Sequence, residues 1–230
     1  MAIVTVDFDG TLYQGDSFKA MFKAGKKWFG FQQWLTLVMV IIASLATWAF
    51  KGKQAMRMCF FRGFAKTFKG MSKQELDDFF EELASSDLSN VNVELVEKLR
   101  EHEKRGDRII ILSGALHPFL EAFRDLLELD AEIISTRLTF TDEMICTGRV
   151  EKIINGEEKV TEFKKWLIDN EMKPGFGETA FSTWAYADSR TDIPLFEYVQ
   201  TPVVVNPNEE MEAIAREKRW PIFDEALAEL

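Results

Sequence analysis

The sequence has few of the residues that build disulfide frameworks or metal sites based on nitrogen and sulfur. Its 230 residues include two cysteines and two histidines, and none of the four lies at a spacing typical of metal ligands. We therefore expect Cys59 and Cys146 to be reduced and buried, as is usual in the cytosol. His102 is expected to face solvent, whereas His117 lies close to Ser113 and is a candidate for ligand contact.

The chain also lacks an excess of positive charge. Its net charge of -10 disfavours a nucleic-acid partner, because binding to a phosphate backbone requires a basic surface. An apolar, strand-like run follows Met1 directly, so we expect no signal peptide. Hydrophobic residues make up 47% of the chain, which is enough for one large core with a smaller appendage.

Charged residues are absent from one long segment, residues 29–50. Two lysines flank this segment on each side: Lys26 and Lys27 before it, and Lys51 and Lys53 after it. Its length is that of a transmembrane helix. A single crossing would, however, separate residues 3–6 from residues 108–112, which we expect to share one sheet. The alternatives are a helix buried in a cap or in a homodimer interface, and a helix that contacts a membrane surface.

Patterns typical of strands and helices alternate along most of the chain. Strands are expected at residues 3–6, 108–112, 132–135, 181–187 and 202–205, with a hairpin over 137–140 and 148–153. Helices are expected to begin near Asp16, Lys53, Ser72, Val91 and Gly156, and a last helix is expected to end near Lys218. This alternation predicts an α/β fold with a doubly wound parallel sheet. Residues 17–86 read as an inserted, all-helical cap domain, and residues 1–16 and 87–230 as the α/β core domain.

Polar residues follow the ends of the predicted strands. Asp7 and Asp9 follow the first strand, Ser113 follows the second, and Asp188 follows the strand at 181–187. Each could be an ordinary turn or helix-capping residue. Because the carboxyl ends of parallel strands meet at one edge of a sheet, we expect these residues to lie together. Carboxylates are the ligands that Mg²⁺ prefers, and a carboxylate beside a metal ion can attack phosphorus.

Four motifs occur in the order in which they occur in one known family. They are Asp7-Phe-Asp9-Gly-Thr11-Leu, Ile111-Leu-Ser113-Gly114, Gly156-Glu-Glu-Lys159 and Ala187-Asp188-Ser-Arg-Thr-Asp192. With them the chain resembles the haloacid dehalogenase (HAD) superfamily, in its phosphoserine-phosphatase-like branch, subfamily IB. The resemblance covers nearly the whole chain and implies a Rossmann-like core with a helical cap.

The resemblance implies roles for the four aspartates of these motifs. Asp7 would be the nucleophile, forming an aspartyl-phosphate, and a ligand of Mg²⁺. Asp9 would be the general acid and base, with its backbone carbonyl on the metal. Asp188 would be a further metal ligand, and Asp192 would support the metal through its waters.

It also implies which residues hold the phosphate. Ser113 and the Gly114 amide would bind phosphate oxygens, and Lys159 would neutralise their charge. In the cap, Arg57 and Arg62 are candidates for substrate contact.

The function expected from these residues is Mg²⁺-dependent hydrolysis of a phosphomonoester. The substrate is either a small soluble phosphomonoester or a lipid-like, amphiphilic phosphate, the latter indicated by the apolar residues 34–50. The alternative is a membrane-associated or dimerising interaction protein with a vestigial phosphatase site. We expect the protein in the cytoplasm, either free or peripheral to the inner face of the membrane.

Overall fold

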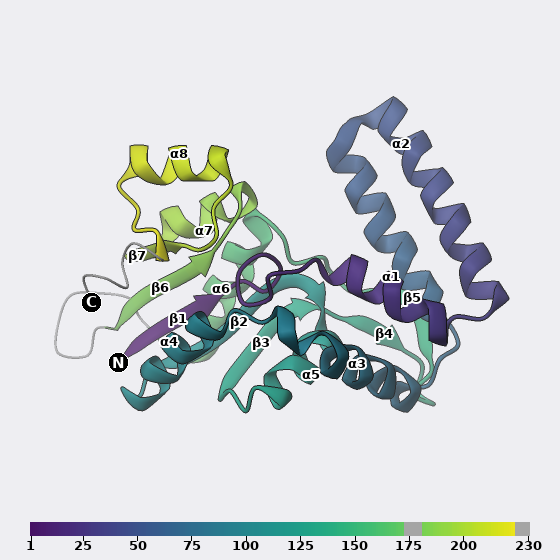
Figure 1. Cartoon of the computed structure of the whole chain (residues 1–230), viewed down its shortest axis with the longest axis horizontal. Coiled ribbons are helices and arrows are strands. Elements are labelled where there is room, and N and C mark those ends of the chain that lie inside the picture. The colour runs from purple at the N-terminus through teal and green to yellow at the C-terminus, as the bar shows by residue number, and fades with distance from the viewer. Residues whose placement is uncertain (173–180, 224–230) are drawn as a thin grey trace.

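A five-stranded parallel sheet forms the centre of the molecule (Figure 1). The computed structural model describes residues 1–172 and 181–223 of the chain. In spatial order the strands are β3 (Ala131–Thr136), β2 (Arg108–Leu116), β1 (Ala2–Val6), β6 (Ser182–Ala187) and β7 (Thr201–Val204). Every neighbouring pair in this sheet is parallel. The predicted α/β class and parallel sheet are confirmed.

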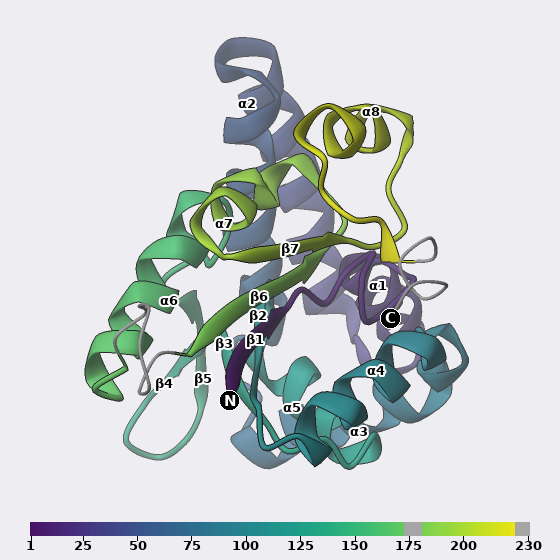
Figure 2. The ribbon, with the colours of Figure 1, turned by 90° about the vertical axis from the view of Figure 1, so that its left-hand side faces the viewer.

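Helices cover both faces of the sheet (Figure 2). One face carries α4 (Val93–Lys104) and α5 (His117–Leu126), and the other carries α6 (Glu157–Asp169), α7 (Ile193–Tyr198) and α8 (Glu209–Lys218). Successive residues of β1 point to opposite faces. Val4 belongs to the hydrophobic cluster that contains Phe119 of α5, whereas Ile3 belongs to the cluster that contains Phe163 of α6.

The chain between β1 and α4 is mostly helical. Its elements are α1 (Ser17–Trp28), α2 (Phe31–Phe64), the 3₁₀ turn η1 (Ala65–Phe68), α3 (Lys73–Asp87) and the 3₁₀ turn η2 (Leu88–Asn90). Asp16 caps α1 by accepting a hydrogen bond from the Lys19 amide at 2.9 Å, and Ser72 and Glu75 form a capping box at α3. The predicted helix starts at Asp16 and Ser72 are therefore confirmed.

A small antiparallel hairpin contacts the end of this helical region. Its strands are β4 (Leu138–Phe140) and β5 (Cys146–Val150), and the Gly70 amide donates to the Cys146 carbonyl at 2.9 Å. The division into a cap at 17–86 and a core at 1–16 and 87–230 stays a prediction. The core range includes 173–180 and 224–230, which lie outside the described residues.

Helix α2 is bent back on itself into two arms that project from the rest of the molecule (Figure 1). The reversal is at Gly52, whose φ of 82° and ψ of 178° lie in a region open essentially to glycine alone. We call residues 31–51 the outer arm and residues 53–64 the inner arm. The arms pack closely, because a Cβ atom on Gly63 would lie 2.5 Å from Cγ1 of Val40.

The outer arm excludes two of the alternatives left open for residues 29–50. Within the described residues, one helix, Phe31–Lys53, has the length and apolar composition to cross a membrane. β1 and β2 are hydrogen-bonded neighbours in one sheet, so a single crossing between them is excluded. The alternative of a helix buried in the cap is wrong. Only 17% of the most apolar part of this helix is buried, and its two ends, Phe31 and Phe50, are 82% and 88% exposed.

Two expectations about single side chains are also wrong. His102 is buried rather than solvated, with Nδ1 2.9 Å from Oδ2 of Asp107 and Nε2 3.0 Å from the Tyr186 hydroxyl. Cys59 is half-buried, whereas Cys146 is buried as predicted. His102 thus joins α4 to β6, which explains why a titratable ring lies in the core.

The Gly52→Ala substitution should weaken the turn between the arms. A side chain is strained at this backbone conformation, so we expect a loss of about 1–3 kcal/mol in the stability of the hairpin. Hydrogen exchange of the α2 amides measures this loss locally. Gly30→Ala is the matched control, because Gly30 at the other end of the same arm has a φ of -80° that any residue adopts. Equal exchange rates in the two variants would contradict the assignment of the turn.

Candidate active site

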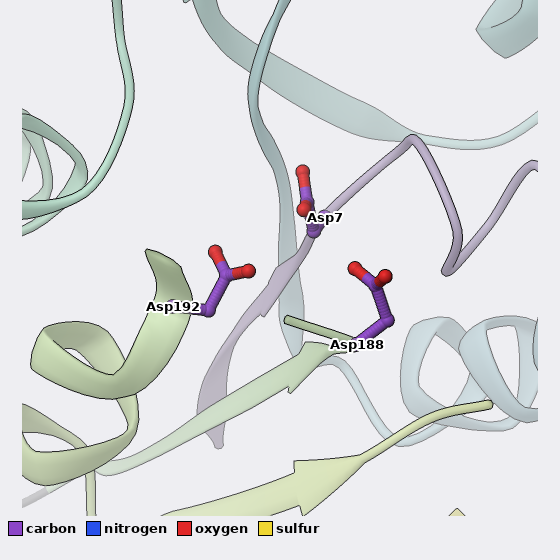
Figure 3. A group of neighbouring side chains, drawn as sticks. All are labelled: Asp7, Asp188 and Asp192. Atoms are coloured by element: carbon purple, nitrogen blue, oxygen red, sulfur yellow. The ribbon is translucent and has the colours of Figure 1, made fainter. Parts of the chain in front are cut away.

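The carboxyl ends of β1 and β6 bring three aspartates together (Figure 3). Asp7 follows β1, Asp188 follows β6, and Asp192 ends the 3₁₀ turn η3 (Arg190–Asp192). The Asp7 amide donates to the Tyr186 carbonyl at 2.9 Å, which keeps Asp7 in line with the sheet. One carboxylate oxygen from each aspartate lies within 4.8 Å of the others. Strand order, rather than closeness in sequence, therefore creates this acidic cluster.

Lys159, on the first turn of α6, lies between two of these carboxylates. Its Nζ is 2.9 Å from Oδ1 of Asp7 and 2.5 Å from Oδ1 of Asp192. Burial lowers the pKa of the Lys159 ammonium, but the carboxylates of Asp192 and Asp7 outweigh burial and raise it above its ordinary value. The second oxygen of Asp192 accepts a hydrogen bond from Ser189 Oγ at 2.6 Å. Both oxygens of Asp192 are thus engaged by protein groups.

Asp7 and Asp188 have carboxyl groups that are poorly stabilised as anions. Burial, more than any other cause, raises the pKa of Asp7, and burial together with the charge of Asp7 raises the pKa of Asp188 to about 7. A Cβ atom on Gly10 would lie 2.4 Å from Oδ2 of Asp188, so the backbone approaches this carboxylate closely. The carboxylates of Asp7 and Asp188 are adjacent oxygen ligands whose negative charge Lys159 alone does not balance, and such a pair suits a divalent cation such as Mg²⁺. Asp192, in contrast, is positioned to hold Lys159.

Asp9 connects the sheet edge to the helical region. Its Oδ1 accepts from the Ser17 amide and its Oδ2 from Ser17 Oγ, both at 2.7 Å. Burial raises the pKa of the Asp9 carboxyl to about 7, although the hydrogen bonds from Ser17 oppose the shift. Sequence reasoning missed the role of Ser17. The sequence predicts a helix start near Asp16, and this start has two caps, because Asp16 accepts from the Lys19 amide and Asp9 accepts from Ser17.

One cavity of about 970 Å³ contains most of the residues singled out from the sequence. The predicted site residues that line it are Asp7, Asp9, Ser113, Gly114, Lys159, Asp188 and, from the inner arm, Arg57. Ser113 is buried, and its Oγ accepts from the Ala115 amide at 3.3 Å. Gly114 lies close to the backbone at Ile154, because a Cβ atom on Gly114 would be 3.1 Å from the Ile154 carbonyl oxygen.

Two expected contacts lie elsewhere. Arg62 is exposed and is not part of the cavity lining. His117 also lies outside the lining: its Nδ1 is 2.8 Å from Ser135 Oγ and its Nε2 is 3.4 Å from Glu121 Oε1. Sequence reasoning missed Asn155 and Arg190, which line the cavity. Asn155 directly precedes the motif that begins at Gly156, and Arg190 stands inside the motif from Ala187 to Asp192, and these positions were the available signal.

The cavity has a second, apolar wall. It is formed by side chains of α1 and of the inner arm: Phe18, Phe22, Met56, Phe60, Phe61 and Phe64. The acidic cluster and Lys159 lie at the sheet edge, so the cavity is polar on one side and apolar on the other. Such a lining fits a ligand with an anionic group and a hydrophobic part.

Comparison with known proteins agrees with this geometry. The model of a family described as haloacid dehalogenase-like hydrolase matches residues 4–197. A histidinol-phosphatase of Neisseria meningitidis serogroup C (strain 8013) is 30% identical over 156 residues, covering 66% of this chain and 68% of that protein.

Solved structures show the same fold. A protein of unknown function from Bordetella pertussis Tohama I matches with a TM-score of 0.79 at 22% identity, covering 96% of this chain and 97% of that one. A probable phosphoserine phosphatase from Vibrio cholerae matches with a TM-score of 0.62 at 18% identity, and the match covers 92% of this chain and 58% of that one. The chain belongs to the haloacid dehalogenase-like hydrolase family.

Proposed function

We propose that the protein is a Mg²⁺-dependent phosphomonoester hydrolase that works through an aspartyl-phosphate on Asp7. The observation that carries the proposal is the ion pair between the buried Asp7 and Lys159, beside Asp188 in the cavity that also contains Ser113. This combination supplies a nucleophile, a fixed positive charge and a cation site within one cavity. Positioning and charge neutralisation are most of what phosphoryl transfer requires.

The contacts of Asp7 assign its two oxygens. Oδ1 accepts from the Phe8 amide at 2.7 Å and from Lys159, so Oδ2 is the oxygen that attacks phosphorus. Asp7 and Asp188, with the backbone carbonyl of Asp9, would hold Mg²⁺, which supplies neutralisation of negative charge when bound. Ser113 and the Gly114 amide bind the remaining phosphate oxygens.

Asp9 moves the proton in both halves of the reaction. As the bond between Asp7 and phosphorus forms, the ester bond breaks and the leaving oxygen takes the proton of Asp9. The Asp9 carboxylate then takes a proton from water, whose oxygen attacks phosphorus and releases phosphate from Asp7. A pKa of about 7 suits a group that must give and regain a proton near neutral pH.

The substrate class has two alternatives, a small soluble phosphomonoester and an amphiphilic or lipid phosphate. The apolar cavity wall favours the amphiphilic class, and Arg57 beside that wall is the proposed contact for further negative charge. Phosphoserine is not expected. Asp16 and Thr191 line the cavity where, by the family resemblance, phosphoserine phosphatases carry Glu and Asn toward the substrate.

The other candidate is an interaction protein, either membrane-associated or dimerising, with a vestigial site. The exposed outer arm favours an interaction role, but it does not argue for a lost activity. The lysine buried between two carboxylates argues against a vestigial site, because desolvating such a network of charges is costly and a well-packed apolar core would be at least as stable. The two roles are therefore compatible, and we propose an active enzyme.

Release of phosphate from a panel of phosphomonoesters tests the proposal. The panel contains soluble esters, histidinol phosphate among them, and lipid phosphates, all with Mg²⁺. We expect turnover that Asp7→Asn lowers by about 10³-fold or more, because the nucleophile is lost. Asp125→Asn, on the surface of α5, is the control. Turnover that survives in Asp7→Asn would overturn the aspartyl-phosphate route, and silence across the panel would favour the vestigial site.

Asp9→Asn should separate the two halves of the reaction. With an aryl phosphate, whose leaving group needs little proton donation, we expect a burst of one aryl alcohol per enzyme and then turnover slowed by about 10²–10⁴-fold. Rapid-quench kinetics measures the burst. Asp125→Asn is again the control, because Asp125 is exposed and lies outside the cavity lining, so kcat should change little. Equal kcat losses in both variants would contradict the assignment.

Mg²⁺ should stabilise the protein more at high pH than at low pH. Asp9 and Asp188 have folded pKa values of about 7, above the ordinary carboxyl value of 3.8, so the metal-free fold loses stability as pH rises from about 4 through 7. Mg²⁺ would bind the deprotonated carboxylate of Asp188 and offset the part of this loss that comes from Asp188. We expect calorimetry to show a larger Mg²⁺-induced rise in Tm at about pH 8 than at about pH 5. Asp188→Asn should remove most of that rise, and an equal rise at both pH values would contradict the cation site.

A further inference from the structure

The outer arm of α2 has its polarity reversed relative to a helix of a soluble domain. Only 17% of its most apolar 18-residue stretch is buried. Large apolar side chains point outward: Phe31, Leu35, Val38, Met39, Ile41, Ile42, Leu45, Trp48 and Phe50, each at least 39% exposed. We call these nine residues the apolar face. A contiguous exposed surface of this kind marks an interaction site.

The side of the outer arm that faces inward combines aliphatic and hydroxyl-bearing residues. Leu37, Val40 and Ser44 are buried there, and the half-buried Thr47 donates from Oγ1 to the Ala43 carbonyl of its own helix at 2.8 Å. Gly63 of the inner arm lies against Val40 at a distance that leaves no room for a side chain. A glycine and a buried hydroxyl thus allow the two helices to approach closely, while most large apolar side chains of the outer arm lie outside, as in helices that contact lipid.

The charge around the apolar face indicates what kind of surface it meets. Residues 17–74 contain eleven lysines and arginines and no aspartate or glutamate, although the whole chain has a net charge of -10. Lys26 precedes the outer arm, and Lys51 and Lys53 lie at its far end. A second copy of the chain would present the same basic charge and repel it. An anionic lipid surface complements both the charge and the apolar face.

The apolar face continues into the candidate active site. The ring of Phe22, which lines the cavity, contacts the ring of Trp34 at a centroid distance of 5.4 Å. Trp34 belongs to the outer arm and lies one turn from Phe31 and Val38 of the apolar face. An apolar path thus leads from the exposed arm to the cavity wall.

We propose that the hairpin of α2 docks the protein on an anionic lipid bilayer, with the apolar face lying in the interface. It does not span the bilayer, because Lys51 and Lys53 flank the turn and both arms return to the same side of the sheet. The lysines contact lipid headgroups while the apolar face enters the boundary with the acyl chains. The proposal concerns binding alone and stands independently of the proposed catalytic activity.

Co-sedimentation of the full chain with lipid vesicles tests this proposal. We expect binding to vesicles that contain phosphatidylglycerol, weaker binding to pure phosphatidylcholine, and a loss of binding as salt increases. The double variant Leu35→Glu/Ile42→Glu places charge in the apolar face and should abolish binding. Ile168→Glu is the control, because Ile168 on α6 is 75% exposed and distant in sequence from the hairpin.

A second pair of variants tests the charge without touching the apolar face. Lys26→Gln/Lys51→Gln should weaken binding to the anionic vesicles by about 25-fold, since each lysine near such a surface contributes roughly fivefold. Lys104→Gln/Lys165→Gln removes the same charge from exposed positions of α4 and α6 and should change binding little. Circular dichroism of each variant checks that it folds.

Two results would overturn the proposal. One is the absence of binding to anionic vesicles by the folded wild-type chain. The other is a dimer in sedimentation velocity that Leu35→Glu/Ile42→Glu converts to monomer, which would assign the apolar face to a second copy. Neither readout depends on turnover, so failure of the docking proposal is distinguishable from failure of the proposed function.

Discussion

The buried ion pairs of Lys159 are the interaction on which the candidate site depends. The ammonium lies between Asp7 and Asp192, and Ser189 engages the oxygen of Asp192 that Lys159 does not hold. Removing one partner from a buried pair leaves an uncompensated charge and costs roughly 3–5 kcal/mol. The same lysine favours the ionised form of Asp7 against the cost of burial, which a nucleophilic carboxylate requires. Stability and reactivity are therefore linked through one side chain.

A second connection joins this site to the helical region. Ser17, the first residue of α1, gives both its amide and its hydroxyl to the carboxylate of Asp9. Any movement of α1 relative to the sheet would change the surroundings of the proposed acid and base. The inner arm of α2 supplies Arg57 and the apolar wall, and the outer arm packs on the inner arm. Docking of the outer arm on a surface would thus reach the cavity through directly packed elements.

Most of the fold could be predicted because its signals are local. Alternating strand and helix patterns gave the sheet, and the caps at Asp16 and Ser72 gave helix starts within a residue or two. Exposure could not be predicted in the same way. An uncharged run such as residues 29–50 has the same composition whether it is buried, exposed to lipid or paired with a second copy. His102 was misjudged for the related reason that its partner Tyr186 lies 84 residues away.

The sequence by itself determined the chemistry that is available: the order of the motifs, the identities of Asp7, Asp9, Ser113, Lys159 and Asp188, and the family to which they point. Only the tertiary structure decided which of the marked residues act together. It brought Arg57 to the cavity and left Arg62 and His117 outside, and it engaged Asp192 with Lys159 and Ser189. The reason is physical: residue type sets what a side chain can do, whereas strand order and the reversal at Gly52 set which distant side chains it meets.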